Sequence, residues 1–268
     1  MKLDGCSALI TGASAGIGRE FARVLVRRAR ALVLVARRLE RLEELRDELV
    51  KQNPNLIVHI QVVDLAEPGQ ANRLVDWLAQ SKIEIDLLIN NAGLGDMGAF
   101  ATSEPERVER MLLVNISALT LLTRGLLPNM LSHRRGGILN VSSSAGFLPI
   151  PEFSVYAATK AYVTSFSEGL RAELRGTGIS VCALCPGPVH TEFTQVAQRA
   201  TPPPHPPGAE MIYVSAPEVA RIGLEAIEHD RPLVIPGLVM KIGMAIVRLM
   251  PLALLRLASG ISGRRSRR

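Results

Sequence analysis

The sequence contains few of the residues that form disulfide bonds. Only three cysteines occur in 268 residues, so we expect no disulfide framework and a reducing compartment. No metal site is expected either. Cys182 and Cys185 have the spacing of a redox motif but lie in an apolar run typical of a strand. Residues three apart in a strand face opposite sides of the sheet. We therefore interpret both as core cysteines.

Two further absences concern targeting and charge. The segment 1–5 lacks the apolar core and cleavage site of a signal peptide, so a cytoplasmic protein is expected. The net charge of +6 comes with 26 arginines against five lysines, and four of those arginines fall within 264–268. No basic stripe interleaved with aromatic residues occurs elsewhere, which argues against a nucleic-acid partner.

Short apolar runs alternate with segments of helical period from residue 7 to residue 185. Strands that are apolar throughout and separated by amphipathic helices indicate a parallel sheet covered on both faces. We therefore predict an α/β fold with a doubly wound parallel sheet, a Rossmann-type three-layer sandwich. The strands are expected at 7–11, 31–36, 57–63, 86–90, 137–142 and 179–185, and the helices at 16–28, 39–52, 68–80, 105–131 and 153–175.

The chain is expected to form one catalytic domain, residues 1–230, followed by an extension. A proline-rich stretch follows the last predicted strand, at the sheet edge where ligands bind in such folds. We interpret about 190–215 as a substrate lid, with a simple connector as the alternative. The extension, 231–268, is apolar and basic.

A glycine-rich loop follows the first strand and runs directly into a helix. The segment Thr11-Gly12-Ala13-Ser14-Ala15-Gly16-Ile17-Gly18 allows a tight turn and a close approach of the backbone to a pyrophosphate at the helix N-terminus. Arg37 and Arg38 follow the second strand, where many NAD-binding sheets carry an acidic residue. Guanidinium groups suit a 2′-phosphate, so NADP(H) is expected, with NAD(H) as the alternative.

Tyr156 and Lys160 stand four residues apart in a predicted helix, which stacks a phenol and an ammonium on one face. A nearby cation favours the phenolate, so we expect a lowered tyrosine pKa. Chance supplies such a pair in roughly 6% of chains of this composition. The other motifs are therefore needed to support acid/base chemistry on an alcohol or ketone.

Taken together, the motifs resemble those of the short-chain dehydrogenase/reductase family in its single-domain branch. They occur in the family's order and spacing from residue 5 to about 195. The matching segments are 11–18, Asp64-Leu65, Asn90-Asn91-Ala92-Gly93, Asn115, Ser143, Tyr156 with Lys160, and Pro186-Gly187-Pro188-Val189-His190-Thr191.

The resemblance implies a catalytic tetrad. Tyr156 would be the general acid/base, and Lys160 would lower its pKa and hold the nicotinamide ribose. Ser143, chosen from three consecutive serines by its offset from the tyrosine, would polarise the substrate oxygen. Asn115 would position a water that links Lys160 to solvent. The cofactor itself would carry the hydride chemistry.

The resemblance also implies the cofactor contacts. Ala15 stands where many NADP-dependent members carry a basic residue, which leaves the phosphate to Arg37, Arg38 and Arg41. The expected contacts are Gly12, Ser14, Ala15, Gly16, Ile17, Gly18, Arg37, Arg38, Asp64, Leu65, Asn91, Ala92, Gly93, Tyr156, Lys160, Pro186, Gly187, Val189 and Thr191.

Three segments are expected to line the substrate pocket, namely 94–100, 147–153 and 191–196. Their large side chains favour an apolar, lipid-like or aromatic carbonyl over a sugar. They are Leu94, Met97, Phe147, Leu148, Ile150, Phe153 and Phe193.

The extension is strongly apolar from 232 to 262, but Lys241, Arg248 and Arg256 interrupt it. No charge-free run there approaches the roughly 20 residues that span a bilayer. If the segment is helical, the three cations fall on one face. A helix over the pocket, a dimerisation surface and a peripheral membrane anchor remain open.

We therefore predict an NADP(H)-dependent oxidoreductase that interconverts a ketone or aldehyde and an alcohol. Its partner is a small carbonyl or alcohol substrate, and a homo-dimer or homo-tetramer is expected from the resemblance. Two other functions on the same fold remain open. One is a regulatory protein that binds cofactor without turnover, and the other is an epimerase or dehydratase with tightly held cofactor.

Overall fold

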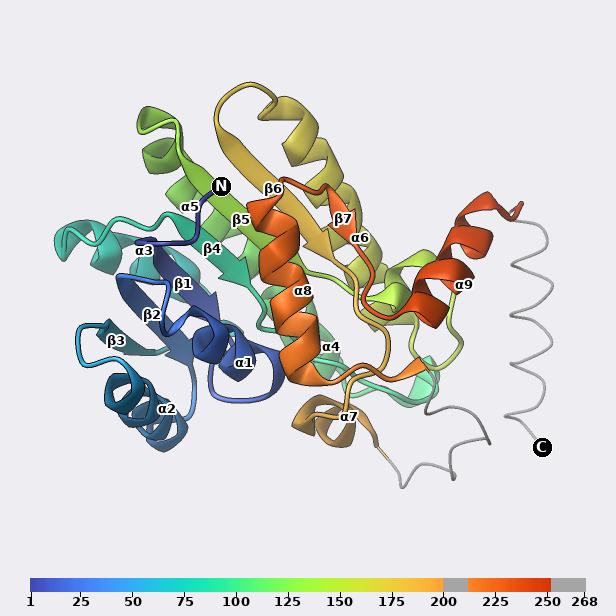
Figure 1. Ribbon diagram of the computed structural model, residues 1–268. Helices are drawn as coiled ribbons and strands as arrows, with labels where there is room; N and C mark the ends of the chain where they lie inside the picture. Colours follow the sequence, from blue (N-terminus) through green and yellow to red (C-terminus); the bar gives the residue numbers. More distant parts are fainter. Residues whose placement is uncertain (200–211, 252–268) are drawn as a thin grey trace.

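The computed structural model of the chain describes residues 1–199 and 212–251, and its centre is a parallel sheet (Figure 1). Seven strands lie in the order β3-β2-β1-β4-β5-β6-β7. Every pair of neighbours is parallel. The strands are β1 (Ser7–Thr11), β2 (Ala31–Ala36), β3 (Ile57–Val62), β4 (Leu87–Asn90), β5 (Gly136–Val141), β6 (Ile179–Leu184) and β7 (Leu233–Val234).

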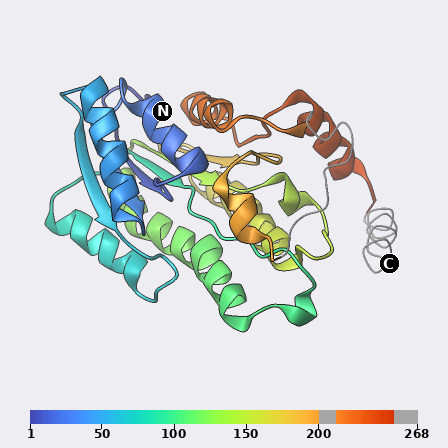
Figure 2. The same cartoon turned by 90° about the horizontal axis from the view of Figure 1, so that it is seen from below.

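Helices cover both faces of the sheet, which confirms the predicted three-layer sandwich (Figure 2). Helices α1 (Gly16–Leu25), α2 (Leu39–Gln52) and α8 (Ala216–Glu228) pack against one face. Helices α3 (Gln70–Gln80), α5 (Leu119–Ser132) and α6 (Ser154–Glu173) pack against the other. Short helices and turns complete the described part: η1 (Phe100–Thr102), α4 (Pro105–Leu112), η2 (Leu113–Ala118), η3 (Ser144–Phe147), α7 (Glu192–Ala197) and α9 (Leu238–Leu249).

The two cores explain why the central strands are apolar throughout. Along β1, Ala8 and Ile10 belong to the core on the α1 side, whereas Leu9 belongs to the core on the α5 side. Alternate side chains of one strand are therefore buried in different layers. Only the edge strand β3 exposes large apolar side chains, at Ile57 and Val62.

The long helix predicted at 105–131 is interrupted. The structure has α4, then a π-helical turn, η2, and then α5. The stretch Pro105–Ser132 has the length and composition of a membrane span. Its buried residues, such as Val114 and Leu122, pack in the core against the sheet, as expected of a core helix.

Beyond Cys185 the sequence predicts only a conditional helix in 232–262, yet the described residues contain four further elements, the short helix α7 and the three that follow it. Helix α8 packs beside α1, β7 joins the sheet next to β6, and α9 lies at the edge of the molecule (Figures 1 and 2). The expected domain boundary at residue 230 falls between α8 and β7. Much of the expected lid, 200–211, lies outside the described residues, as does 252–268.

Candidate active site

A cavity of about 810 Å³ opens at the carboxyl ends of the strands. Loops that follow β1, β2, β4, β5 and β6 line it, together with residues of α7 and α9. The strand order reverses between β1 and β4, and crevices at such a switch point are where open α/β sheets bind ligands.

The glycine loop after β1 leaves no room for side chains. Gly12 and Gly16 have positive φ angles of 67° and 54°, a conformation that glycine adopts without strain. A Cβ at Gly18 would lie 2.2 Å from the backbone oxygen of Gly12. The first turn of α1 carries no acidic residue, and Ala15 at its N-cap offers no capping side chain. The free amides and the helix dipole therefore suit an anionic phosphate.

Thr11 holds the ends of β1 and β4 together. Its hydroxyl oxygen accepts hydrogen bonds from the backbone amides of Asn91 and Ala92, each at 3.0 Å. The Asn91 side chain donates to the backbone oxygen of Thr11 at 2.8 Å. These bonds fix the floor of the cavity next to the glycine loop.

The arginines after β2 lie where they were predicted but are flanked by carboxylates. Arg38 Nη1 lies 2.9 Å from Glu192 of α7, and Arg41 lies 3.7 Å from the same carboxylate. Arg38 also donates to the Ser14 hydroxyl at 3.4 Å. The guanidinium of Arg38 lowers the pKa of Glu192, so Glu192 is an anion beside the arginine cluster. Sequence reasoning missed Glu192, since nothing in the pattern places it opposite α2.

Asp64, after β3, lies between two further arginines. Arg110 of α4 donates to its carboxylate at 2.7 Å, and Arg37 lies 3.8 Å away. Burial raises the pKa of Asp64, but the Ala66 amide and the Arg110 guanidinium outweigh it, so the pKa lies below its ordinary value. Asp64 is therefore a fixed anion at the rim of the cavity.

Ser143 follows β5 and begins the turn η3. Its side-chain oxygen accepts a hydrogen bond from the amide of Ala145 at 3.1 Å. Ser142 differs, because its buried hydroxyl donates to the backbone oxygen of Lys160 at 2.7 Å. Ser142 therefore connects the end of β5 to α6.

Gly146 sets the distance between η3 and α6. A Cβ there would lie 2.7 Å from the carbonyl carbon of Lys160 and 2.8 Å from the amide of Ala161. The turn therefore lies directly on the backbone of α6, and this contact brings Ser143 next to Tyr156. A single glycine without a motif around it offered no sequence signal for this role.

Tyr156 and Lys160 both lie on the buried face of α6. Lys160 Nζ lies 5.6 Å from the centre of the Tyr156 ring and donates to the backbone oxygen of Val141 at 2.8 Å. Burial lowers the pKa of Lys160 to about 8. Burial raises the pKa of Tyr156 to about 12, against the opposing hydrogen bond of Ser143.

The tyrosine pKa thus differs in direction from the sequence-based expectation. Helical spacing predicts a cation one turn away, and the structure confirms that proximity. Loss of hydration is the larger effect here, because the phenol is buried and the ammonium bonds to Val141 instead of to the phenol oxygen. At neutral pH the group is therefore a phenol that can donate a proton.

Asn115 lies behind the cavity wall, on the π-helical turn η2. Its side-chain amide donates to the backbone oxygen of Leu94 at 2.9 Å and to the Thr159 hydroxyl at 3.0 Å, and its oxygen accepts from the Leu94 amide at 2.8 Å. A Cβ at Gly93 would lie 3.5 Å from Lys160 Nζ and 3.6 Å from Asn115 Oδ1. Asn115 and Lys160 therefore both lie close to Gly93 in the cavity wall.

Aromatic and apolar side chains surround the phenol. Phe153 stacks on the Tyr156 ring with 4.2 Å between centres, and Phe193 of α7 packs at 5.4 Å. The predicted lining residues Leu94, Met97, Leu148 and Ile150 also face the cavity. Phe147 does not, and its ring lies beneath the guanidinium of Arg248. Met240 and Met244 of α9 add to the lining.

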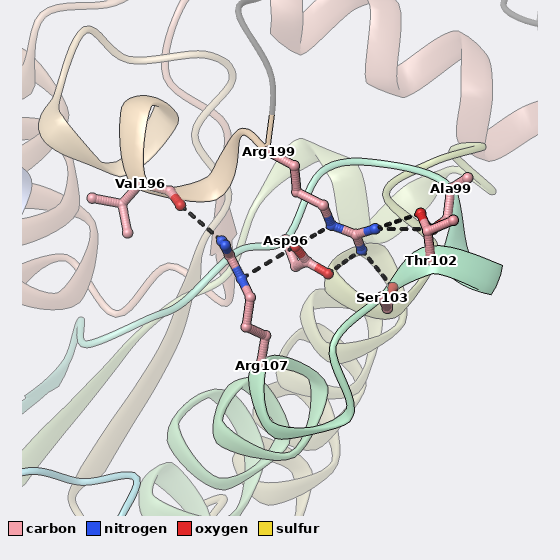
Figure 3. A network of polar contacts seen from close by, with 7 residues as sticks. All are labelled: Asp96, Ala99, Thr102, Ser103, Arg107, Val196 and Arg199. Carbon is pink, nitrogen blue, oxygen red and sulfur yellow. Dashed lines mark hydrogen bonds and ion pairs between the residues drawn. The ribbon is translucent and has the colours of Figure 1, made fainter.

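Helix α7 is fastened to the segment after β4 through the Asp96 cluster, which comprises Asp96, Arg199 and Arg107 (Figure 3). Arg199 Nε donates to the buried Asp96 carboxylate at 2.7 Å, and Arg107 lies 3.4 Å away. Arg107 also donates to the backbone oxygen of Val196 at 3.0 Å. Arg199 lowers the pKa of Asp96, which keeps the carboxylate charged.

Backbone contacts reinforce this attachment of α7. The amide of Met97 donates to the oxygen of Ala197 at 2.7 Å. A Cβ at Gly95 would meet Phe193 at 2.8 Å and Ala197 at 2.9 Å. The helix is thus pressed against the segment after β4 and places Phe193 against Tyr156.

The structure brings nearly all the predicted site residues to one cavity. Of the predicted cofactor contacts, all except Gly18 line it, and Gly18 supports the loop from beneath. Ser143, Tyr156 and Lys160 line it as well, whereas Asn115 stands one layer behind. Among the described residues, no cluster of metal-binding side chains occurs.

Comparisons with known proteins agree with this architecture. The family model for short chain dehydrogenase matches residues 7–201. A short chain dehydrogenase of Pseudocercospora fijiensis is 35% identical over 195 residues, covering 72% of this chain and 62% of that protein. The sulfoacetaldehyde reductase of Chromohalobacter salexigens is 39% identical over 193 residues, covering 70% of this chain and 74% of that protein.

One solved structure is similar over most of the chain. The short-chain dehydrogenase from Sphingobium yanoikuyae, in complex with NADPH, superposes with a TM-score of 0.78 at 33% identity, covering 87% of this chain and 88% of that chain. With the glycine loop, the serine and the tyrosine-lysine pair in one cavity, the chain belongs to the short-chain dehydrogenase family of NAD(P)-dependent oxidoreductases.

Proposed function

We propose that the protein is an NADP(H)-dependent oxidoreductase that interconverts an apolar ketone or aldehyde and its alcohol. The observation that carries this proposal is the placement of the Tyr156 phenol, Lys160 and Ser143 in the cavity that the glycine loop also lines. An acid/base group and a dinucleotide loop in one cavity fit hydride transfer coupled to proton transfer.

The residues of the cavity fit a dinucleotide phosphate. A Cβ at Gly12 or Gly18 would meet neighbouring protein atoms, so the glycines keep the loop closely packed, and the uncapped N-terminus of α1 suits a pyrophosphate. Arg37, Arg38 and Arg41 would hold a 2′-phosphate through charge-assisted hydrogen bonds. The nicotinamide would supply or accept the hydride.

The protein groups then handle the oxygen and the proton. With its pKa raised to about 12, the Tyr156 phenol carries its proton at neutral pH and donates it to a carbonyl oxygen during reduction. Ser143 would donate a hydrogen bond to the same oxygen and polarise the carbonyl. Lys160, held by Val141, would bind the ribose and stabilise the phenolate left after transfer.

The proposed substrate is apolar because the half of the cavity near Tyr156 is apolar. Phe153 and Phe193 pack against the phenol ring, and Leu94 and Ile150 belong to the same apolar cluster. Such a lining favours an alkyl or aromatic ketone over a polyol, since a sugar hydroxyl buried there would lose its hydrogen bonds to water.

A carbonyl panel tests this function. The purified full-length chain would be assayed for NADPH oxidation with alkyl and aromatic ketones and with sugars, and then with NADH. We expect turnover of the apolar carbonyls and at least about a tenfold preference in kcat/KM for NADPH, equivalent to about 1.4 kcal/mol from the arginines. A preference for NADH, or for sugars, would refute the corresponding part of the proposal.

We also propose that the chain forms a homo-dimer or homo-tetramer and acts in the cytoplasm. Exposed apolar side chains on α4, α5 and α6, including Leu112, Leu121 and Tyr162, supply a surface for assembly. The cysteines of the chain are all free and buried thiols, as suits a reducing compartment. Light scattering after size-exclusion chromatography would give the assembly.

A further inference from the structure

Helix α9 carries an apolar stripe that faces solvent. The stripe consists of Leu238, Val239, Ile242, Ile246 and Leu249, whose exposed fractions range from 47% to 86%. At 3.6 residues per turn, these side chains and Ala245 between them fall within an arc of about 120°. Exposed apolar surface of this kind marks a site of contact with another apolar phase.

The remaining sides of α9 have different environments. Met240 and Met244, on the opposite side, are buried and line the cavity. Lys241 and Arg248 lie along one border of the stripe and are exposed. Arg248 contacts Glu168 at 3.4 Å and lies over the Phe147 ring, which keeps it beside the body of the protein. The helix is therefore anchored by its methionines while its apolar stripe points outward.

The sequence from β7 onward carries charge of a single sign. From residue 232 to residue 268 the chain has six arginines and one lysine but no aspartate or glutamate. Each cation near an anionic lipid surface contributes about 1 kcal/mol to the free energy of membrane binding. A second copy docked stripe to stripe would bring these like charges together across a two-fold axis, which costs energy. The charge thus favours an anionic lipid surface over a second copy.

We propose that the α9 stripe binds the surface of an anionic membrane. The apolar side chains would enter the boundary between headgroups and acyl chains, and the exposed Lys241 at the border of the stripe would contact the anionic headgroups. The helix lies along the surface and does not cross the bilayer.

This location has a consequence that rests on the proposed function. Because Met240 and Met244 of the same helix line the cavity, membrane binding would bring the cavity close to the acyl chains. The substrate class would then be a carbonyl compound dissolved in the membrane, which agrees with the apolar lining around Tyr156.

Vesicle co-sedimentation of the full-length protein tests the proposal. We expect binding to phosphatidylcholine vesicles that contain phosphatidylglycerol, and much weaker binding without phosphatidylglycerol or at high salt. The double variant Ile242→Asp/Ile246→Asp should bind at least about tenfold more weakly, because two isoleucines no longer enter the apolar phase. Thermal unfolding of each variant verifies that it is folded.

Ile57 provides the matched control. It is 52% exposed on the edge strand β3, against 53% for Ile242 on α9. Ile57→Asp should therefore leave vesicle binding within about twofold of the wild type, since it removes an equally exposed apolar side chain far from the stripe. If vesicle binding falls equally in the double variant and in Ile57→Asp, the binding is nonspecific adsorption and the proposal is overturned.

Two further results would also overturn it. One is a failure of the wild-type protein to bind anionic vesicles. The other is a wild-type oligomer that dissociates in the double variant, with no vesicle binding by the wild type. That result would show that a second copy covers the stripe. Vesicle binding is measured without substrate, so a protein that binds vesicles yet reduces no carbonyl would refute the proposed function alone.

Discussion

At the residue scale, burial determines the protonation of the two central groups. Both Tyr156 and Lys160 lie almost entirely within the protein, and burial favours the neutral form of each, raising one pKa and lowering the other. At pH 7 the lysine, with a pKa of about 8, still carries its charge. The pair therefore presents a proton donor beside a cation.

Glu192 gives a test of cofactor recognition at the same scale. Its carboxylate pairs with Arg38 and Arg41, so it competes with a 2′-phosphate for those guanidinium groups. We expect Glu192→Gln to bind NADPH severalfold more tightly while NADH affinity stays nearly constant. Fluorescence titration with both cofactors measures this. Glu40→Gln, on the exposed start of α2, is the control, and a parallel change for NADH would contradict the assignment.

At the element scale, the contact between η3 and α6 positions the candidate catalytic groups. Ser143 belongs to the turn and Tyr156 to the helix, and Gly146 allows their backbones to touch. The distance between serine and tyrosine therefore depends on a residue that carries no chemistry of its own.

Replacing Gly146 by alanine should separate the two elements. We expect Gly146→Ala to destabilise the protein by about 1–3 kcal/mol and to lower kcat, because Ser143 moves away from Tyr156. Gly169→Ala, on the open face of the same helix, should instead stabilise it by up to about 1 kcal/mol. Denaturant unfolding and steady-state kinetics check both, and an unchanged kcat in folded Gly146→Ala would refute the positioning role.

Helix α7 is the second element that bears on the site, because the Asp96 cluster fixes Phe193 against Tyr156. Asp96→Asn removes the buried carboxylate charge. Each hydrogen bond to a charged group contributes about 1.5–3 kcal/mol to stability, so the attachment of α7 should weaken. We expect faster hydrogen exchange in the peptide 192–199 and a substrate KM raised about tenfold. Asp76→Asn, on α3, should change neither quantity. Unaltered exchange in Asp96→Asn would show that backbone contacts alone hold α7.

At the scale of the whole molecule, the layered fold could be predicted because its signal is local. Each buried strand is apolar throughout and each helix is amphipathic, so composition and period determine the element. The π-helical turn at η2 could not be predicted, because its signature is a hydrogen-bond pattern within a continuous helical period. A helix within 232–262 is among the alternatives that the sequence leaves open, and α9 lies there. The sequence does not predict α7, α8 and β7, because β7 has only two residues and prolines obscure the period.

The site could be predicted to the extent that its residues occur in motifs. The glycine loop, Ser143, Tyr156 and Lys160 are such residues, and they meet in one cavity. Glu192, Gly146 and the Asp96 cluster act through contacts between segments far apart in the chain, which spacing does not encode. The tyrosine pKa was expected in the wrong direction because sequence shows a neighbouring cation but not the depth of burial.

The three buried thiols predict how the stability of the whole molecule depends on pH. Burial raises the pKa of Cys6 and Cys182 to about 12 and that of Cys185 to about 11, from an ordinary value of 9.0. A pKa raised by folding contributes stability that is present below the unfolded pKa and is lost as pH rises toward the folded pKa. Lys160 acts in the opposite sense above about pH 8, whereas Tyr156 adds to the loss above its ordinary pKa of 10.0.

Stability should therefore fall by about 2 kcal/mol between pH 9 and pH 10, because the three thiols together lose about 3 kcal/mol and the lysine restores about 1 kcal/mol. Denaturant unfolding at pH 8, 9 and 10 measures the slope. Cys6→Ala should lower the absolute stability through a cavity but reduce the slope by about 1 kcal/mol per pH unit. A stability that stays constant up to pH 10 would contradict the burial of the thiols.

The most direct test of the proposed chemistry is the rate of carbonyl reduction by Tyr156→Phe, measured with NADPH beside the affinity for NADPH. Removing only the phenolic hydroxyl should lower kcat by about 10²–10⁴-fold while NADPH binding stays within about twofold. Tyr162→Phe, on the exposed side of the same helix and bonded to Thr120, should keep wild-type turnover. Turnover in Tyr156→Phe equal to that of the wild type would contradict the assignment of this tyrosine as the proton donor.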